Sequence, residues 1–258
     1  MSALRYVYGI ARASDAPTIE SARISGIDGG RVNCVAEGEL LAAASDVDES
    51  DYGSLPLNEH VSDLEWLAAR AAQHQAVNGR LLELCGTVLP LSFGAIYRDD
   101  ERVREMLRED RADRAERLAT LEGRSEWVLT VSRDADSPIV DDDVRALDEE
   151  IAVSPPGRAF LLDKRRGSAI ARSLERRDAE AASEALDVLV PVVERSYREP
   201  VATGGTDAVV LRASVLLPRD RERALASAIG DIERRLGGRG YRVRASGPWP
   251  AYRFGGMP

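Results

Sequence analysis

The sequence is poor in cysteine and has no long apolar run, and each absence excludes a class of protein. Of its 258 residues two are cysteine, Cys34 and Cys85, too few for the disulfide framework of a small secreted domain. No run of about 18 apolar residues occurs, so we expect no membrane insertion. No signal-peptide core follows the first residues. These features predict a cytoplasmic protein with reduced thiols.

Histidine is equally scarce, and its spacing argues against a catalytic or metal site. Cys34, Cys85, His60 and His74 form no CxxC or HxxxH pattern, so we expect no zinc site. His74 continues the apolar face of a predicted helix, which favours a hydrogen-bonded core or boundary residue, whereas His60 should be exposed in a loop. Cys85 follows His74 at about 16 Å along that helix, too far for a nucleophile and its base.

Phosphate-binding loops are absent as well. Gly26-Ile-Asp-Gly29-Gly30 lacks the GxGxxG order, and Lys164, the only lysine, is followed by arginine and not by Ser or Thr. Paired acids such as Asp141–Asp143 and Glu149–Glu150 lie in charge-rich stretches with no apolar pocket to raise their pKa. The sequence therefore predicts no catalytic, cofactor-binding or metal-binding residue, no cofactor, and no enzymatic activity.

The basic face that proteins binding nucleic acids need is missing too. The net charge is -9, and arginines alternate with acids, as in Arg108-Glu109-Asp110-Arg111, which is typical of a solvated face with many ion pairs. The predicted strand Ala208–Leu217 carries no aromatic side chain on which RNA bases could stack. We expect no nucleic-acid partner.

What is present predicts a mixture of helices and strands in the first half of the chain. The expected strands are Leu4–Ile10, a segment around Val32–Cys34, Gly38–Ala44, and an edge strand within Thr87–Tyr97 that contains Pro90. An acidic loop is expected at Asp46–Asp51. The expected helices run from Ser62 to Cys85, with a capping box between Ser62 and Glu65, and from Asp99 to Leu121, with Gly123 beyond its end.

The second half predicts the element order of a split βαβ unit. The expected elements are a strand at Glu126–Ser132, helices within Asp142–Arg198 broken at Pro155 and Pro191, a strand near Pro200–Thr203, a strand at Ala208–Leu217, a helix at Asp220–Leu236 and a strand at Tyr241–Ala245. The predicted fold class is α+β, with an N-terminal α/β domain at 1–122 and a C-terminal ferredoxin-like (βαββαβ) domain at 123–258.

Five segments in order resemble the gas vesicle protein F/L family. They are Tyr6-Val-Tyr-Gly-Ile10, HQAVNGRLLELCGTVLPLSFGAIY from His74 to Tyr97, Leu121-Glu-Gly-Arg-Ser-Glu126, SPPGRAFLL at Ser154–Leu162, and GPWPAYRF from Gly247 to Phe254. Two positions depart from the family pattern: Phe160 stands where the family has tyrosine, and Ala251 replaces a proline. We expect the last segment to form a rigid, non-helical tail whose Trp249 and Tyr252 cover a sheet or a domain seam.

The resemblance implies an accessory or minor structural protein of the gas vesicle. It implies binding to the hydrophobic shell protein and to other accessory proteins during vesicle formation, and a location at the vesicle or in the cytoplasm. It implies no catalytic residue. The alternative is a small-molecule enzyme or sensor built on the ferredoxin-like domain, which would need a deep apolar cavity with convergent polar groups.

Overall fold

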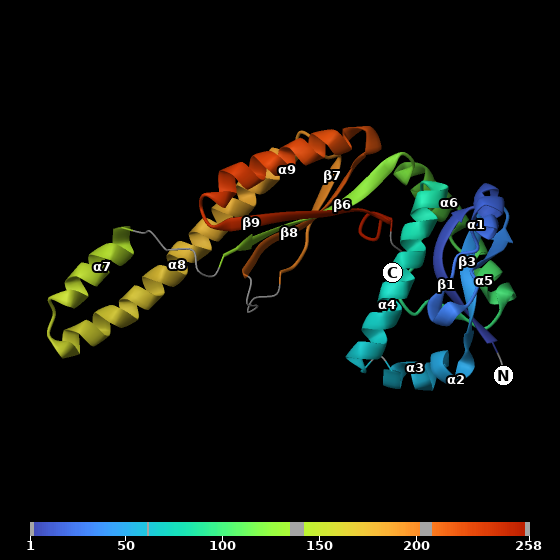
Figure 1. Ribbon diagram of the computed structural model, residues 1–258, viewed down its shortest axis with the longest axis horizontal. Coiled ribbons are helices and arrows are strands. Elements are labelled where there is room, and N and C mark those ends of the chain that lie inside the picture. Colours follow the sequence, from blue (N-terminus) through green and yellow to red (C-terminus); the bar gives the residue numbers. More distant parts are fainter. Residues whose placement is uncertain (1–2, 61, 135–141, 202–207, 256–258) are drawn as a thin grey trace. The chain divides into compact units, whose positions relative to one another are not determined.

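The computed structural model describes residues 3–60, 62–134, 142–201 and 208–255, which form two compact units (Figure 1). Unit 1 comprises Met1–Glu126 and Gly247–Pro258, and unit 2 comprises Trp127–Ser246. The C-terminal segment thus belongs to the unit formed by the start of the chain, whereas the predicted division placed it in the second domain. The fold is a mixture of helices and sheets, as predicted.

Unit 1 is built on a sheet with β1 at its centre. The strands described in it are β1 (Ala3–Arg12), β2 (Asn33–Glu37), β3 (Leu40–Asp48), β4 (Leu89–Pro90) and β5 (Ile96–Tyr97). Their order is β2-β3-β1-β4, and β5 also pairs with β1; these described pairs are antiparallel. Pro90 lies in an edge strand, as predicted, because a residue without a backbone N–H cannot pair on both sides.

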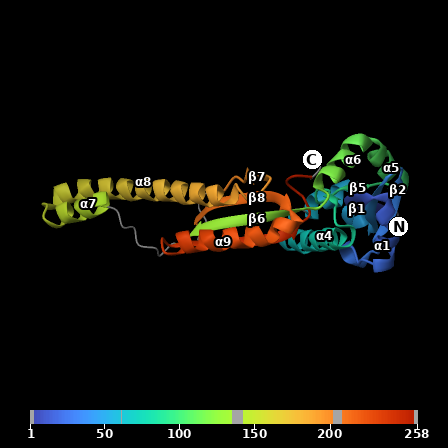
Figure 2. The ribbon, with the colours of Figure 1, turned by 90° about the horizontal axis from the view of Figure 1, so that it is seen from above.

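Helices lie on both sides of this sheet (Figures 1 and 2). Those described are η1 (Ala13–Asp15), α1 (Ala16–Ala22), η2 (Ile27–Gly29), α2 (Glu49–Tyr52), α3 (Ser54–His60), α4 (Leu64–Cys85), α5 (Asp100–Arg108) and α6 (Arg111–Leu121). α4 packs on β1 through Val77 and Leu81, and α5 covers the other side with Val103 and Leu107, all fully or almost fully buried.

Two local predictions in unit 1 are wrong. The acidic segment Asp46–Asp51 is not a loop, because its first residues extend β3 opposite β1 and the rest begin α2. The cap of α4 is Asp63, whose carboxylate accepts hydrogen bonds from the backbone N–H groups of Glu65 (3.0 Å) and Trp66 (3.2 Å). Ser62 therefore precedes the cap, since a carboxylate one residue later satisfies the first free amides.

The predicted helix from Asp99 to Leu121 is two helices, α5 and α6. The break is at Asp110, whose φ of 53° is left-handed and incompatible with a continuous helix. Arg114 stabilises the break, because its buried guanidinium donates to the carbonyls of Met106 and Glu109. Gly123 has a φ of 70°, as expected of a residue just past a helix end.

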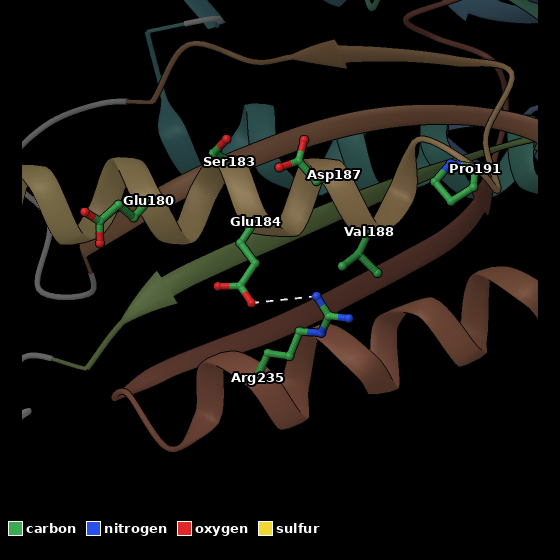
Figure 3. A pocket seen from close by; sticks show the side chains of 7 residues that line it. All are labelled: Glu180, Ser183, Glu184, Asp187, Val188, Pro191 and Arg235. Atoms are coloured by element: carbon green, nitrogen blue, oxygen red, sulfur yellow. Dashed lines mark ion pairs between the residues drawn. The ribbon is translucent and has the colours of Figure 1, made fainter.

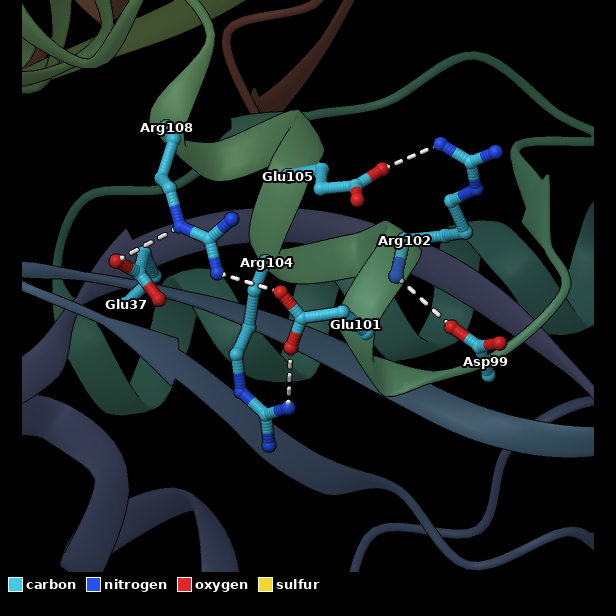
Figure 4. A network of polar contacts seen from close by, with 7 residues as sticks. All are labelled: Glu37, Asp99, Glu101, Arg102, Arg104, Glu105 and Arg108. Atoms are coloured by element: carbon cyan, nitrogen blue, oxygen red, sulfur yellow. Dashed lines mark hydrogen bonds and ion pairs between the residues drawn. The ribbon is translucent and has the colours of Figure 1, made fainter.

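Exposed charges on α5 form a network with the neighbouring strand (Figure 4). Arg108 contacts Glu101 (2.6 Å) and Glu37 of β2 (3.1 Å), and Arg104 contacts Glu101 from the other side (3.2 Å). The hydrogen bonds from Arg108 and then from Arg104 lower the pKa of Glu101. The interleaved arginines and acids thus form a solvated face with many ion pairs, as predicted.

Unit 2 carries a second sheet. Its described elements are β6 (Arg124–Arg133), α7 (Asp142–Ala152), α8 (Pro156–Leu189), β7 (Arg195–Arg198), β8 (Ala208–Pro218), η3 (Arg219–Arg221), α9 (Glu222–Gly237) and β9 (Tyr241–Trp249), with strand order β7-β8-β6-β9. Leu211, Ala213, Val215 and Leu217 alternate along β8, and they share one core with α8 and α9. Both helices therefore cover the same face of the sheet.

The segment that follows α8 differs from the prediction. The helix stops at Leu189, before Pro191, as expected, but Arg195–Arg198 is not helical: it forms strand β7, antiparallel to β8 with Arg195 opposite Leu216. Of the strand expected near Pro200–Thr203, Pro200 and Val201 belong to no strand, and the following two residues lie outside the described part of the chain. Beyond the sheet, α7 packs along the first half of α8 as a helical hairpin (Figures 1 and 2).

Candidate functional site

A set of buried polar and aromatic groups in unit 1 lies at the contact of β1 with α4. We call Tyr6, Tyr8, His74, Asn78 and Phe93 the tyrosine–histidine cluster. Tyr6 and Tyr8 point to the same face of β1 because they are two residues apart, and His74 and Asn78 share one face of α4 because they are four apart. All four are at most 4% exposed.

Both ring nitrogens of His74 have polar neighbours. Nδ1 lies 3.0 Å from the Tyr6 hydroxyl, and Nε2 lies 3.0 Å from the Asn78 amide nitrogen. Asn78 also donates to the backbone carbonyl of Tyr8 (3.1 Å), and the Gly94 amide donates to the Tyr6 hydroxyl (3.1 Å). Burial lowers the pKa of His74 to about 4, so the imidazole is neutral near pH 7. The prediction of a hydrogen-bonded core histidine is confirmed.

Gly9 of β1 and Gly26, which precedes η2, make room for this cluster. A Cβ at Gly9 would lie 2.8 Å from Asn78 Oδ1 and 2.9 Å from Val88 Cγ2. A Cβ at Gly26 would lie 2.3 Å from the Tyr8 hydroxyl, which accepts from the Ile27 amide (2.7 Å). The start of the Gly26–Gly30 segment therefore packs against a tyrosine.

The cysteines are poorly suited to nucleophilic chemistry. Burial raises the pKa of Cys34 to about 11 and that of Cys85 to about 12, so both are thiols near neutral pH. A catalytic cysteine needs the opposite shift, because the thiolate is the reactive form. In the described residues no group of three or more His, Cys, Asp or Glu could hold a metal ion.

A second polar cluster, which the sequence did not reveal, joins α2, η2 and α4. The Tyr52 hydroxyl donates to Asp28 (2.6 Å), and Arg70 contacts Asp28 (3.1 Å) and donates to the Tyr52 hydroxyl (3.3 Å). The Arg70 guanidinium lies 4.4 Å from the centre of the Trp66 ring, on which His60 stacks at 4.9 Å. His60 is thus half-buried, not exposed as expected. These residues are far apart in sequence and form no motif.

The C-terminal motif is attached to unit 1 by a buried carboxylate. Glu126 is 3% exposed and accepts hydrogen bonds from the backbone amides of Arg253 (3.0 Å) and Phe254 (3.2 Å). Tyr252 interacts with Asn78 of the tyrosine–histidine cluster, and burial raises its pKa to about 12. The expected non-helical tail begins as a strand, since β9 continues to Trp249, and Tyr252 reaches the cluster beneath β1.

Unit 2 has an open depression at the C-terminal part of α8, to which α9 contributes Arg235 (Figure 3). It has a volume of about 580 Å³ and is lined by Glu180, Ser183, Glu184, Asp187, Val188, Pro191 and Arg235. Glu184 points toward α9, where it contacts Arg239 (2.7 Å) and Arg235 (3.9 Å). The charged lining differs from the apolar cavity that a small-molecule site requires.

Comparison with known proteins places this arrangement in a family. A model of the family described as "Gas vesicle synthesis protein GvpL/GvpF" matches residues 4–255. The chain belongs to that family. It is 30% identical over 266 residues to gas vesicle protein L of Streptomyces sp. (strain CB03234), covering 98% of this chain and 93% of the relative. It is 27% identical to gas vesicle protein F of the same organism, over 96% of this chain and 98% of the relative. The predicted resemblance is confirmed.

Solved structures share the fold. GvpF from Anabaena sp. PCC7120 superimposes with a TM-score of 0.72 at 19% identity, and GvpF from Microcystis aeruginosa with 0.70 at 18%, each over 100% of both chains. The chain is therefore a gas vesicle family protein with the GvpF fold. None of its described helices is both long and apolar enough to cross a membrane.

Proposed function

We propose that the chain is a non-enzymatic accessory protein that binds the hydrophobic shell protein and other accessory proteins during gas vesicle formation in the cytoplasm. The observation that carries this proposal is the family match over residues 4–255. It is supported by the chemistry of the segments that resemble the family. His74, Tyr6 and Glu126 are used in internal hydrogen bonds, which is the behaviour of structural residues.

We also propose that unit 2 is a ferredoxin-like domain and that no residue serves as a catalytic, cofactor or metal site. Support for the fold is the element order β6, α7–α8, β7, β8, α9, β9 with the strand order β7-β8-β6-β9, in which the last strand lies beside the first. The division at 1–122 and 123–258 stays a prediction about folding domains.

We propose that the shell protein binds to the corner between α3 and α4. Leu55 is 78% exposed and Leu64 is 79% exposed, on either side of the turn that links these helices. The turn is held by backbone bonds from Ser62 to Glu59 and from Asp63 to His60, and by the stacked His60 and Trp66 rings. Two exposed leucines near this turn offer apolar area to an apolar partner.

A capture experiment tests the proposal. The full chain is immobilised and mixed with purified shell protein, and we expect capture by the wild type and at least a tenfold loss with Leu55→Asp combined with Leu64→Asp, because two charges would have to be desolvated. The matched control, Val153→Asp with Phe160→Asp, changes two exposed apolar residues of unit 2 (84% and 73% exposed) and should bind normally.

Two outcomes would contradict it. Equal capture by the corner variant would remove the proposed contact, and absence of capture by the wild type would remove shell binding itself. A deletion strain that still forms normal vesicles would exclude an essential role in assembly.

The alternative of a small-molecule enzyme or sensor has no supporting observation, because the depression in unit 2 is open and lined by charged groups.

A further inference from the structure

One face of α8 is exposed along almost the whole helix. We call this set the α8 stripe; its members are Leu161, Arg165, Ser168, Arg172, Arg176, Glu180, Ser183, Asp187 and Val190, all exposed. At 100° per residue they lie within about 60° of the direction of Arg165, so they form one stripe. Figure 3 shows Ser183 and Asp187 on the side of α8 that points away from α9.

Charge is segregated along α8. From Pro156 to Arg177 the helix has seven Lys or Arg and two acidic residues, whereas from Asp178 to Leu189 it has four acidic residues and no basic one. On the stripe, Arg165 and Arg172 precede Glu180 and Asp187. Within the described part of the chain, none of these four has an ion-pair partner within 4 Å. Each half of the stripe therefore offers the charge that the other half lacks.

Both ends of the stripe are apolar. Leu161 is 63% exposed near the start of α8, and Val190 is 67% exposed at its end. Between them lie Ser168 and Ser183, whose small side chains allow another helix to come close. The stripe therefore has an apolar residue at each end, charges of opposite sign in its two halves, and small residues between them. A second stripe that runs antiparallel would place apolar residues against apolar residues and basic residues against acidic ones.

We propose that two copies of this chain associate through an antiparallel, two-fold contact between their α8 stripes. One antiparallel register brings the complementary residues of the two stripes opposite each other. In it Leu161 faces Val190, Arg165 faces Asp187, Ser168 faces Ser183 and Arg172 faces Glu180. The two residue numbers of each pair sum to 351 or 352, as one constant register requires. In a two-fold interface each contact occurs twice. Arg176 lies at the axis and meets its own copy, the one like-charge contact in the register.

The stripe favours a second copy over another partner because the complementary sequence is present in the chain itself. Exposed ion pairs are individually weak and are screened by salt, so the association should be moderate and salt-sensitive, with the leucine–valine contacts at both ends persisting. Self-association goes beyond the proposed binding of shell protein and does not depend on it, since the α3–α4 corner belongs to unit 1 and α8 to unit 2.

The test is sedimentation velocity of the full chain from about 1 to about 200 µM, at about 50 and about 500 mM salt. We expect reversible dimers that weaken at high salt. Arg165→Glu with Arg172→Glu makes the stripe acidic, and Glu180→Arg with Asp187→Arg makes it basic; each should weaken dimerisation at least tenfold. An equimolar mixture of the two should form heterodimers, and Arg176→Ala should tighten the wild-type dimer.

The matched control is Arg223→Glu with Arg244→Glu, which makes the same charge change at exposed positions of α9 and β9 and should leave dimerisation unchanged. A wild type that is monomeric at every concentration in low salt would overturn the proposal, as would a dimer that survives both stripe reversals. Loss of binding to another gas vesicle protein by stripe variants of a monomeric wild type would also overturn it, and would assign the stripe to that partner. Circular dichroism of each variant verifies folding.

Discussion

At the scale of single residues, the buried polar groups of unit 1 explain why residues typical of active sites serve structure here. His74 has a hydrogen-bonding neighbour at each ring nitrogen and is kept neutral by burial. Removing His74 would leave the Tyr6 hydroxyl and the Asn78 amide with one hydrogen-bonding partner fewer in a buried site. The free-energy penalty of an unsatisfied buried polar group is larger than the net stabilisation from the hydrogen bond itself.

His74 makes stability depend on pH. Its pKa is about 4 in the folded protein against 6.5 for an unperturbed histidine, so the unfolded chain binds the proton more readily between these values. The stabilisation is complete above pH 6.5 and is lost as the pH falls toward 4, by roughly 3 kcal/mol in total. We expect urea unfolding at pH 4 to 7 to show a shallower pH dependence for His74→Gln, which does not titrate. Identical pH dependence of the two proteins would contradict this assignment.

At the scale of elements, helix ends depend on single carboxylates and on left-handed residues. Asp63 caps the start of α4, Asp110 precedes α6, and Gly86, whose φ is 74°, follows the end of α4. Such positions satisfy backbone groups that have no partner within the helix. They also decide where a long periodic pattern is divided, as between α5 and α6.

The cap of α4 can be tested directly. Asp63→Ala removes the acceptor for the Glu65 and Trp66 amides, and we expect it to lower the free energy of unfolding by about 1 kcal/mol. Ser62→Ala, one residue earlier, is the control and should change stability by less than about 0.5 kcal/mol. Thermal denaturation of both variants distinguishes the two residues. A larger effect at Ser62 would restore the capping box that the sequence suggests.

At the scale of the whole molecule, the chain leaves unit 1 at Glu126 and returns to it at Gly247. Unit 2 is thus inserted between two parts of unit 1, and the same glutamate that ends the first part receives the backbone amides of the second. This closure connects the central and C-terminal motifs of the family through Glu126, Asn78 and Tyr252.

The contact between Glu126 and the C-terminal segment predicts which part of the chain is destabilised when that contact is weakened. Glu126→Gln replaces a charged acceptor by a neutral one, and we expect a loss of about 1–3 kcal/mol with faster amide exchange at Arg253 and Phe254 and in β1. Glu116→Gln, at an exposed position of α6, is the matched control. Faster exchange confined to unit 2 would show that the C-terminal segment does not belong with β1.

Local spacing in the sequence determined most elements and the family. The strands at β1 and β8, the end of α4 at Cys85 and the burial of His74 follow from periodicity, glycine and proline, whose effects act within a few residues. Five motifs in order identified the gas vesicle family, which the full-length match confirmed.

Only the tertiary structure determined the contacts and elements that depend on residues distant in the sequence. The Tyr6–His74 contact spans 68 residues and the Glu126–Arg253 contact 127, and no local pattern states that these groups will meet. The β7 strand exists because Arg195–Arg198 lies beside β8, although its sequence continues a helical region. The C-terminal segment joins unit 1 because a buried carboxylate there requires its amides. In each case, a hydrogen-bonding partner distant in the sequence outweighed the local preference.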